Sequence, residues 1–239
     1  MGTTRTTTHP EGAGRLRVLV ATLLALALGL SSYAVLWLTR EGGLIGLHAV
    51  ARDIRYGRLV PVTEIARLMP RIIAKDTRRD LSADDLDDAA LIASLFAEQQ
   101  RSNRIAAPAL WAVAEQLIRE RLARAPADGN SWLRLSYVRT QRFGLDVVAR
   151  QALRMSWLVT PREFSVMWPS LKFRIEHWAD LTADEKGAAA DLMVGLWHKP
   201  PARADVIAYW ARLSVNQRSE LLSLMRDPLC KKALTTAVR

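Results

Sequence analysis

Residues 127–161 read ADGNSWLRLSYVRTQRFGLDVVARQALRMSWLVTP and carry the clearest helical pattern in the chain. Asp128-Gly-Asn130 is a turn signal. Apolar side chains then recur at helical spacing: Trp132, Leu133, Leu135, Tyr137 and Val138. Gly144 interrupts this pattern, and a second helix is predicted over about 145–159, with Pro161 directly beyond it. The stretch therefore predicts two consecutive helices joined by a tight turn.

Start signals on either side extend the helical pattern. Ser82-Ala-Asp-Asp85 resembles a capping box and predicts a helix to about Gln100. Thr160-Pro-Arg-Glu163, with Thr160 as the cap, and Thr182-Ala-Asp-Glu185 predict two further starts. Other helices are expected at about 107–124, 202–213 and 216–226, and from 228 onward. No stretch alternates as a half-buried strand does, so the predicted class is all-α.

The spacing of this array resembles the tetratricopeptide repeat. Pro126 and Pro161 lie 35 residues apart, close to the period of about 34 residues in that family. Residues between them match the aromatic, small and large apolar positions of one unit: Trp132, Leu135, Ser136, Ala149, Leu153 and Ser156. The preceding stretch, about 84–126, matches more loosely because it lacks the aromatic residue. The resemblance implies antiparallel helical hairpins that form a scaffold and bind peptides or partner proteins on a concave face.

An uncharged apolar run precedes the helical array. Residues 18–38 read VLVATLLALALGLSSYAVLWL, and as a helix they would span about 31 Å, the thickness of a bilayer core. A cleaved signal peptide is the alternative, with Ser32-Tyr-Ala34 as its weak cleavage site. Because Val35–Leu38 continue the apolar run past that site, we expect a retained transmembrane helix.

Charges around the run favour a cytoplasmic N-terminus and a C-terminal domain in the periplasm, anchored in a bacterial inner membrane. The opposite orientation, with the domain facing the cytoplasm, remains the alternative. The expected organisation is a disordered tail, 1–16; a transmembrane helix, 17–38; membrane-proximal amphipathic helices, 39–82; tetratricopeptide-like hairpins, 83–161; and a C-terminal helical cap, 162–239.

The membrane-proximal region has two open interpretations. Apolar residues recur at helical spacing from Leu44 to Ile54, with arginines toward the other side. This helix could lie on lipid head groups, or it could pack on the domain. The following apolar stripe, from Ile65 to Ile73, contains Pro70, where a kink or break is predicted.

The net charge and the cysteine count limit the kinds of partner and metal that the chain could bind. The net charge of +10 suits anionic partners such as lipid head groups or an acidic polysaccharide. Nucleic acid is not expected for a domain outside the cytoplasm. Cys230 is the single cysteine, which excludes an internal disulfide and a cysteine-based zinc site.

Motifs for catalysis, cofactors or metals are lacking, so no catalytic, cofactor-binding or metal-binding residue is predicted. There is no HExxH, no GxSxG and no glycine-rich phosphate loop. The aspartates between Asp84 and Asp88 lack the spacing of a calcium loop and suit a first helical turn instead. His177, between Glu176 and Asp180, is interpreted as a surface histidine at a helix end.

Aromatic residues with interleaved arginines, Arg174 among them, dominate the C-terminal half. They could fill the core, or they could line a groove for a partner's apolar groups or for sugar rings. The candidate partner-binding residues are Trp132, Arg134, Tyr137, Arg154, Trp157 and Trp168.

These observations predict a non-enzymatic, membrane-anchored adapter. It would bind a partner protein in a cell-envelope assembly, with polysaccharide synthesis or export as one candidate process. An accessory enzyme subunit that acts on an envelope glycan or lipid is the alternative.

Overall fold

The structure is a computed structural model that describes residues 26–32, 46–77 and 81–237. Every secondary-structure element within these ranges is a helix, which confirms the all-α prediction. The chain divides into two compact units, Met1–Gly46 and Leu47–Arg239.

In the first unit, residues 26–32 are helical and their leucines are exposed. The predicted tail, 1–16, and most of the predicted transmembrane helix, 17–38, lie outside the described residues. Within the described ranges, none of the helices combines the length and apolar character that a membrane crossing requires.

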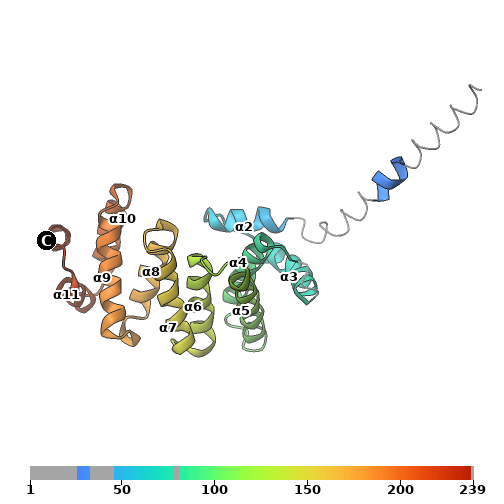
Figure 1. The fold of residues 1–239 in the computed structure, drawn as a ribbon. Helices are drawn as coiled ribbons and strands as arrows, with labels where there is room; N and C mark the ends of the chain where they lie inside the picture. Colours follow the sequence, from blue (N-terminus) through green and yellow to red (C-terminus); the bar gives the residue numbers. More distant parts are fainter. Residues whose placement is uncertain (1–25, 33–45, 78–80, 238–239) are drawn as a thin grey trace, which may run out of the picture. The chain divides into compact units, whose positions relative to one another are not determined.

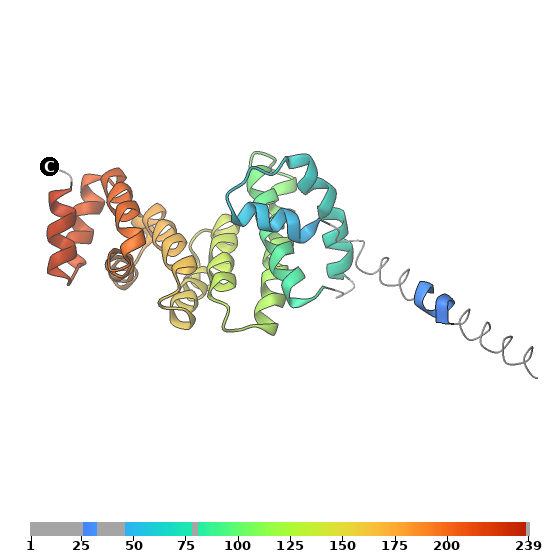
Figure 2. The same cartoon turned by 90° about the horizontal axis from the view of Figure 1, so that it is seen from above.

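The second unit is built from consecutive helices that follow one another in chain order (Figures 1 and 2). They are α2 (Leu47–Arg55), α3 (Val62–Thr77), α4 (Ala83–Gln99), α5 (Ala106–Arg124), α6 (Gly129–Phe143), α7 (Val147–Val159), α8 (Phe164–Glu176), α9 (Ala183–Trp197), α10 (Arg203–Arg212), α11 (Val215–Leu224) and α12 (Pro228–Thr236), with short 3-10 turns at Trp178–Asp180 and Pro200–Ala202. The most extensive packing joins α4 with α5 and α6 with α7, followed by α5 with α6 and then α8 with α9.

Local side-chain chemistry sets several helix ends as predicted. Ser82 caps α4: its hydroxyl accepts from the Asp85 N–H at 3.1 Å, and the Asp85 carboxylate accepts from the Ser82 N–H at 2.9 Å. Thr182 and Glu185 form the same reciprocal pair at α9. Gly144 ends α6 with a φ of 73°, a left-handed conformation that glycine adopts without strain.

The predicted start of a helix at Thr160 is wrong, and of the kink or break predicted at Pro70 the break is absent. Thr160 does not start α8: it is the C-cap of α7, and its hydroxyl donates to the Ser156 carbonyl at 2.8 Å, while Glu163 is the N-cap of α8. Pro70 does not break its helix, since α3 continues through it from Val62 to Thr77. Proline removes one backbone hydrogen bond there, and burial of Leu68, Met69 and Ile72 holds the helix against the domain.

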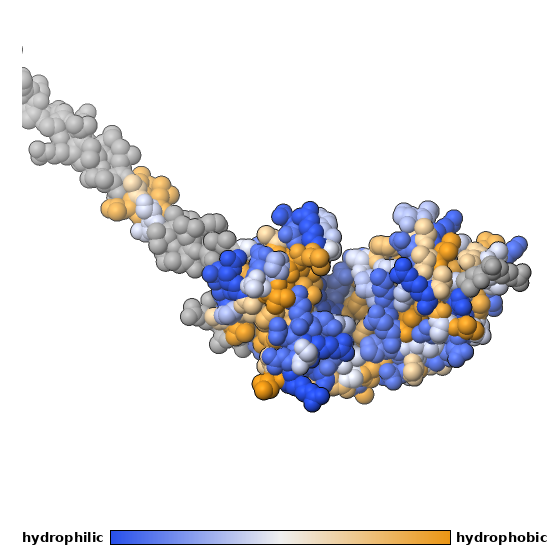
Figure 3. Space-filling view, turned by 180° about the vertical axis from the view of Figure 1, so that it is seen from behind, coloured by the Kyte–Doolittle hydropathy of each residue, from blue (hydrophilic) through white to orange (hydrophobic). Residues whose placement is uncertain are grey.

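The tryptophans belong mainly to the core. Trp111, Trp178 and Trp210 are buried, and the other described tryptophans are half-buried. Trp210 is only 1% exposed and lies in a large apolar cluster formed by α8 to α12. The interpretation of the aromatics of the C-terminal half as core therefore holds for Trp178 and Trp210, while the surface seen in Figure 3 interleaves hydrophilic and hydrophobic residues.

Helix α2 packs on the domain. Leu47, Val50 and Ala51 are buried, and the helix packs against α4. His48 and Arg55 both contact the Asp88 carboxylate, which is itself buried. Of the two interpretations left open by the sequence, packing on the domain accounts for the apolar side of this helix.

Candidate functional site

The six candidate partner-binding residues lie in separate places. Arg134 and Tyr137 belong to a groove on α4, α6 and α8, whereas Arg154 and Trp157 line a cavity between α7 and α9. The other two, Trp132 and Trp168, make contacts within the protein. Trp132 donates to the Pro126 carbonyl at 2.7 Å, and Trp168 packs edge-on against Tyr209 with ring centroids 5.4 Å apart.

The groove, called here the α4–α6–α8 groove, has a volume of about 320 Å³. Its lining residues are Leu91, Asn130, Leu133, Arg134, Tyr137, Pro169 and Phe173. Each of the three helices is the first member of a packed pair, so the groove crosses successive pairs. Such an apolar floor with a few polar side chains is typical of sites that bind peptides.

Polar side chains of this groove are held in place before any ligand arrives. The Arg134 guanidinium donates to the Asp87 carboxylate at 2.8 Å and to the Asp87 carbonyl at 3.1 Å. The Tyr137 hydroxyl donates to Glu98 at 2.9 Å. Burial and the Glu98 carboxylate both raise the pKa of Tyr137, so the phenol stays protonated and keeps this bond. The ring of Tyr137 also meets Trp111 and Phe173 edge-on.

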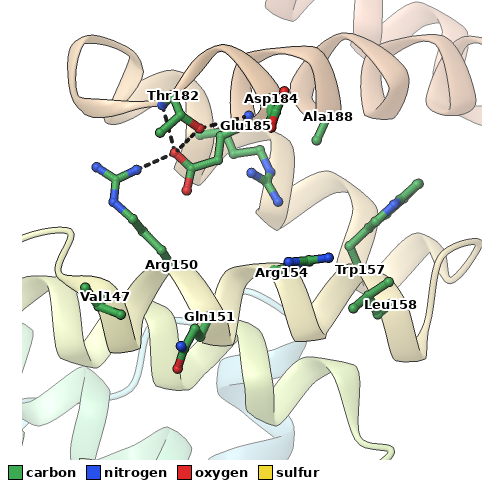
Figure 4. Close-up of a pocket in the computed structure, with 11 residues that line it drawn as sticks. Val147, Arg150, Gln151, Arg154, Trp157, Leu158, Thr182, Asp184, Glu185 and Ala188 are labelled. Atoms are coloured by element: carbon green, nitrogen blue, oxygen red, sulfur yellow. Dashed lines mark hydrogen bonds and ion pairs between the residues drawn. The ribbon is translucent and has the colours of Figure 1, made fainter.

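The second site, called here the α7–α9 cavity, has a volume of about 530 Å³ (Figure 4). Its lining residues are Val147, Arg150, Gln151, Arg154, Trp157, Leu158, Arg174, Thr182, Asp184, Glu185 and Ala188. Trp157 and Leu158 form an apolar side, while Thr182, Asp184 and Glu185 come from the first turn of α9 and its cap. The cavity therefore combines three arginines with one aromatic and several aliphatic side chains.

One of the three arginines is neutralised within the protein. Arg150 forms an ion pair with Glu185 and donates to the Asp180 carbonyl at 2.6 Å. Glu185 in turn accepts from the Thr182 N–H at 2.8 Å as part of the α9 capping box. Arg150 and Glu185 thus join α7 to the start of α9, and their charges cancel.

Arg174 is the unusual member of the cavity. Its side chain is buried at 3% exposure, and its Nε has no hydrogen-bond partner. Burial lowers the pKa of Arg174 to about 10, and the charge of Glu185 only partly opposes this effect. Arg174 is therefore still charged near pH 7, and it carries that charge in a largely desolvated position.

Arg154 is the third arginine, and it is exposed on α7. Among the described residues, no hydrogen bond or ion pair joins its guanidinium to an acceptor. The cavity consequently presents two guanidinium groups, those of Arg154 and Arg174, that form no ion pair within the described residues. No cluster of histidine, cysteine or acidic residues suited to holding a metal occurs in the described part of the chain.

Comparisons with protein-family models, with curated proteins and with solved structures found no match to this chain.

Proposed function

We propose that this chain is a membrane-anchored helical scaffold that binds a partner protein in a cell-envelope assembly, such as one that synthesises or exports polysaccharide. The observation that carries the proposal is the α4–α6–α8 groove, with its apolar floor and its pre-positioned Arg134 and Tyr137. Side chains already fixed by Asp87 and Glu98 lose little conformational freedom on binding, which favours recognition of a flexible peptide segment.

The repeat resemblance supports the same proposal. Its small positions, Ser136, Ala149 and Ser156, are fully buried where α6 and α7 pack together. Small residues at such points let helix axes approach closely. The paired helices from α4 to α7 would then form a tetratricopeptide-like array, with the helices from α8 onward as its cap.

The apolar run at 18–38 supports the anchored part of the proposal. Together with the arginines before it, the run favours a single-pass inner-membrane protein whose helical domain lies in the periplasm. Anionic lipid or acidic polysaccharide would be a secondary partner, suited to the net charge of +10.

Photo-crosslinking tests the groove. A benzophenone amino acid replaces Leu91, which lines the groove, and, as the control, Ala109, which is exposed on α5. In membranes of the native host, we expect one discrete crosslinked protein at position 91, none at position 109, and a lower yield at position 91 when Tyr137→Ala is added. Equal crosslinking at both positions, or none at position 91, would refute the groove as the partner site.

Topology is tested separately, by a reporter fused after Arg239 that is active only outside the cytoplasm. We expect activity from the full chain, and loss of activity when residues 18–38 are deleted, because that run would direct membrane insertion. Activity from a cytoplasmic reporter at the same position would reverse the proposed orientation.

A further inference from the structure

We propose that the α7–α9 cavity binds a small molecule that carries a phosphate monoester on a ring-shaped body. Arg174 and Arg154 would hold the phosphate, and Trp157 with Leu158 would contact the ring. This site is separate from the α4–α6–α8 groove, since the residues lining the two sites do not overlap.

Arg174 is the first reason for an anionic ligand. The buried carboxylates in the described ranges all have polar partners: Asp88 pairs with Arg55, Asp85 accepts from the Ser82 N–H, and Glu115 meets three arginines. Arg174 forms no ion pair of this kind, and its Nε lacks any acceptor. A buried charge without a partner is unfavourable, so a bound anion would relieve that penalty.

The charges of the lining favour an anion. Three arginines against Asp184 and Glu185 give a net charge of +1, and Arg154 and Arg174 are the guanidinium groups that form no ion pair within the described residues. A phosphate monoester carries a charge of about −1.5 to −2 at pH 7. Guanidinium groups match phosphate oxygens through paired, charge-assisted hydrogen bonds. Asp184 would repel a phosphate on the α9 side, which directs the phosphate toward the two arginines.

The apolar lining indicates a ring-shaped body. Trp157 is half-buried, whereas Leu158 and Val147 are 56% and 69% exposed. An indole face stacks well on planar rings and on the C–H faces of sugars. The volume of about 530 Å³ falls within the range of about 300–1,000 Å³ found for small-molecule sites and exceeds what phosphate alone would fill.

The test is calorimetric titration of the full-length protein in detergent with three probes: phenyl phosphate, inorganic phosphate and benzyl alcohol. We expect phenyl phosphate to bind at least tenfold more tightly than inorganic phosphate, and benzyl alcohol to show no binding. Arg174→Met and Trp157→Ala should each weaken phenyl phosphate binding at least tenfold. Arg226→Met, at an exposed arginine outside the cavity, should leave it unchanged.

Folding of the variants is checked by urea unfolding. Because Arg174→Met removes an unpaired buried charge, its unfolding midpoint should equal or exceed that of the unmodified protein. If Arg174→Met does not fold, the exposed Arg154→Met carries the test and should also weaken phenyl phosphate binding at least tenfold. Absence of phenyl phosphate binding at 10 mM, or undiminished binding by the folded arginine variants, would overturn the proposal. The crosslinking experiment at position 91 tests the α4–α6–α8 groove, so its result does not depend on the outcome of the phenyl phosphate titration.

Discussion

Replacing Gly129 by alanine is expected to lower the free energy of unfolding by about 3 kcal/mol, as overpacking of a tight helix contact does. Gly129 starts α6 at the point where the end of α7 crosses it. A Cβ atom added there would lie 1.8 Å from Thr160 Oγ1, 2.9 Å from Thr160 Cβ and 3.0 Å from the Ser156 carbonyl oxygen. Helix propensity alone would favour alanine by about 1 kcal/mol, so the sign of the effect depends on this contact.

Gly187→Ala is the matched control. Gly187 also lies in a helix, α9, but a Cβ atom built on it meets nothing within 4 Å. This variant should therefore raise the free energy of unfolding by about 0.5–1 kcal/mol. Urea unfolding of both variants, followed by circular dichroism, measures the contrast. Equal stabilities of Gly129→Ala and Gly187→Ala would show that α6 and α7 relax apart without penalty.

A double variant identifies the clashing atom. Thr160→Ala removes Oγ1 but retains Cβ, so Gly129→Ala combined with Thr160→Ala should recover part of the lost stability. Recovery should be incomplete because the Ser156 carbonyl belongs to the backbone and cannot move without shifting α7. This contact joins the start of α6 to the end of α7, the two helices within the repeat-like stretch 127–161.

Helix boundaries set by neighbouring residues were predictable from the sequence. The capping boxes of α4 and α9 need only a hydroxyl and an acid three residues apart, and both are found as predicted. Thr160 is a residue for which such local signals predicted the wrong role. Its hydroxyl can cap the helix that follows or bond to the carbonyl four residues before it, and the sequence does not decide between them. In the structure the Thr160 hydroxyl donates to the Ser156 carbonyl, and Thr160 is the C-cap of α7.

The two sites were harder to predict because each depends on helices that are distant along the chain. Aromatic and basic composition pointed to Arg134, Tyr137, Arg154 and Trp157 but did not show that they belong to different faces. Arg174 did carry a usable signal. It follows Met167 and Leu171 at helical spacing, so a charged residue occupies a position on the buried side of α8. Whether such a residue finds a partner is decided only by the packing of α7 and α9.

Glu115 is a buried charge that, unlike Arg174, has ion-pair partners. Replacing Glu115 by alanine should lower the free energy of unfolding by about 3 kcal/mol. Its side chain is 4% exposed on α5 and accepts hydrogen bonds from three arginines. Arg119 donates from the same helix at 2.9 Å, while Arg139 at 3.2 Å and Arg142 come from α6. Without the carboxylate, the half-buried Arg142 loses its described acceptor, although Arg139 keeps Asp146.

The loss should depend on pH. Burial raises the pKa of Glu115, but the hydrogen bonds from Arg119 and Arg142 outweigh burial and hold the pKa below its ordinary value of 4.5. The unfolded chain therefore takes up this proton first as the pH falls, so the stabilisation is present above about pH 4.5 and is lost below it. Urea unfolding at pH 7 and at pH 3.5 should show that the difference in unfolding free energy between the unmodified protein and Glu115→Ala shrinks at the lower pH.

Glu120→Ala is the control, because Glu120 lies on the same helix without such an arginine cluster. It should change the free energy of unfolding by less than about 0.5 kcal/mol at both pH values. An undiminished Glu115→Ala difference at pH 3.5 would mean that lost packing, and not the three arginine contacts, accounts for the effect.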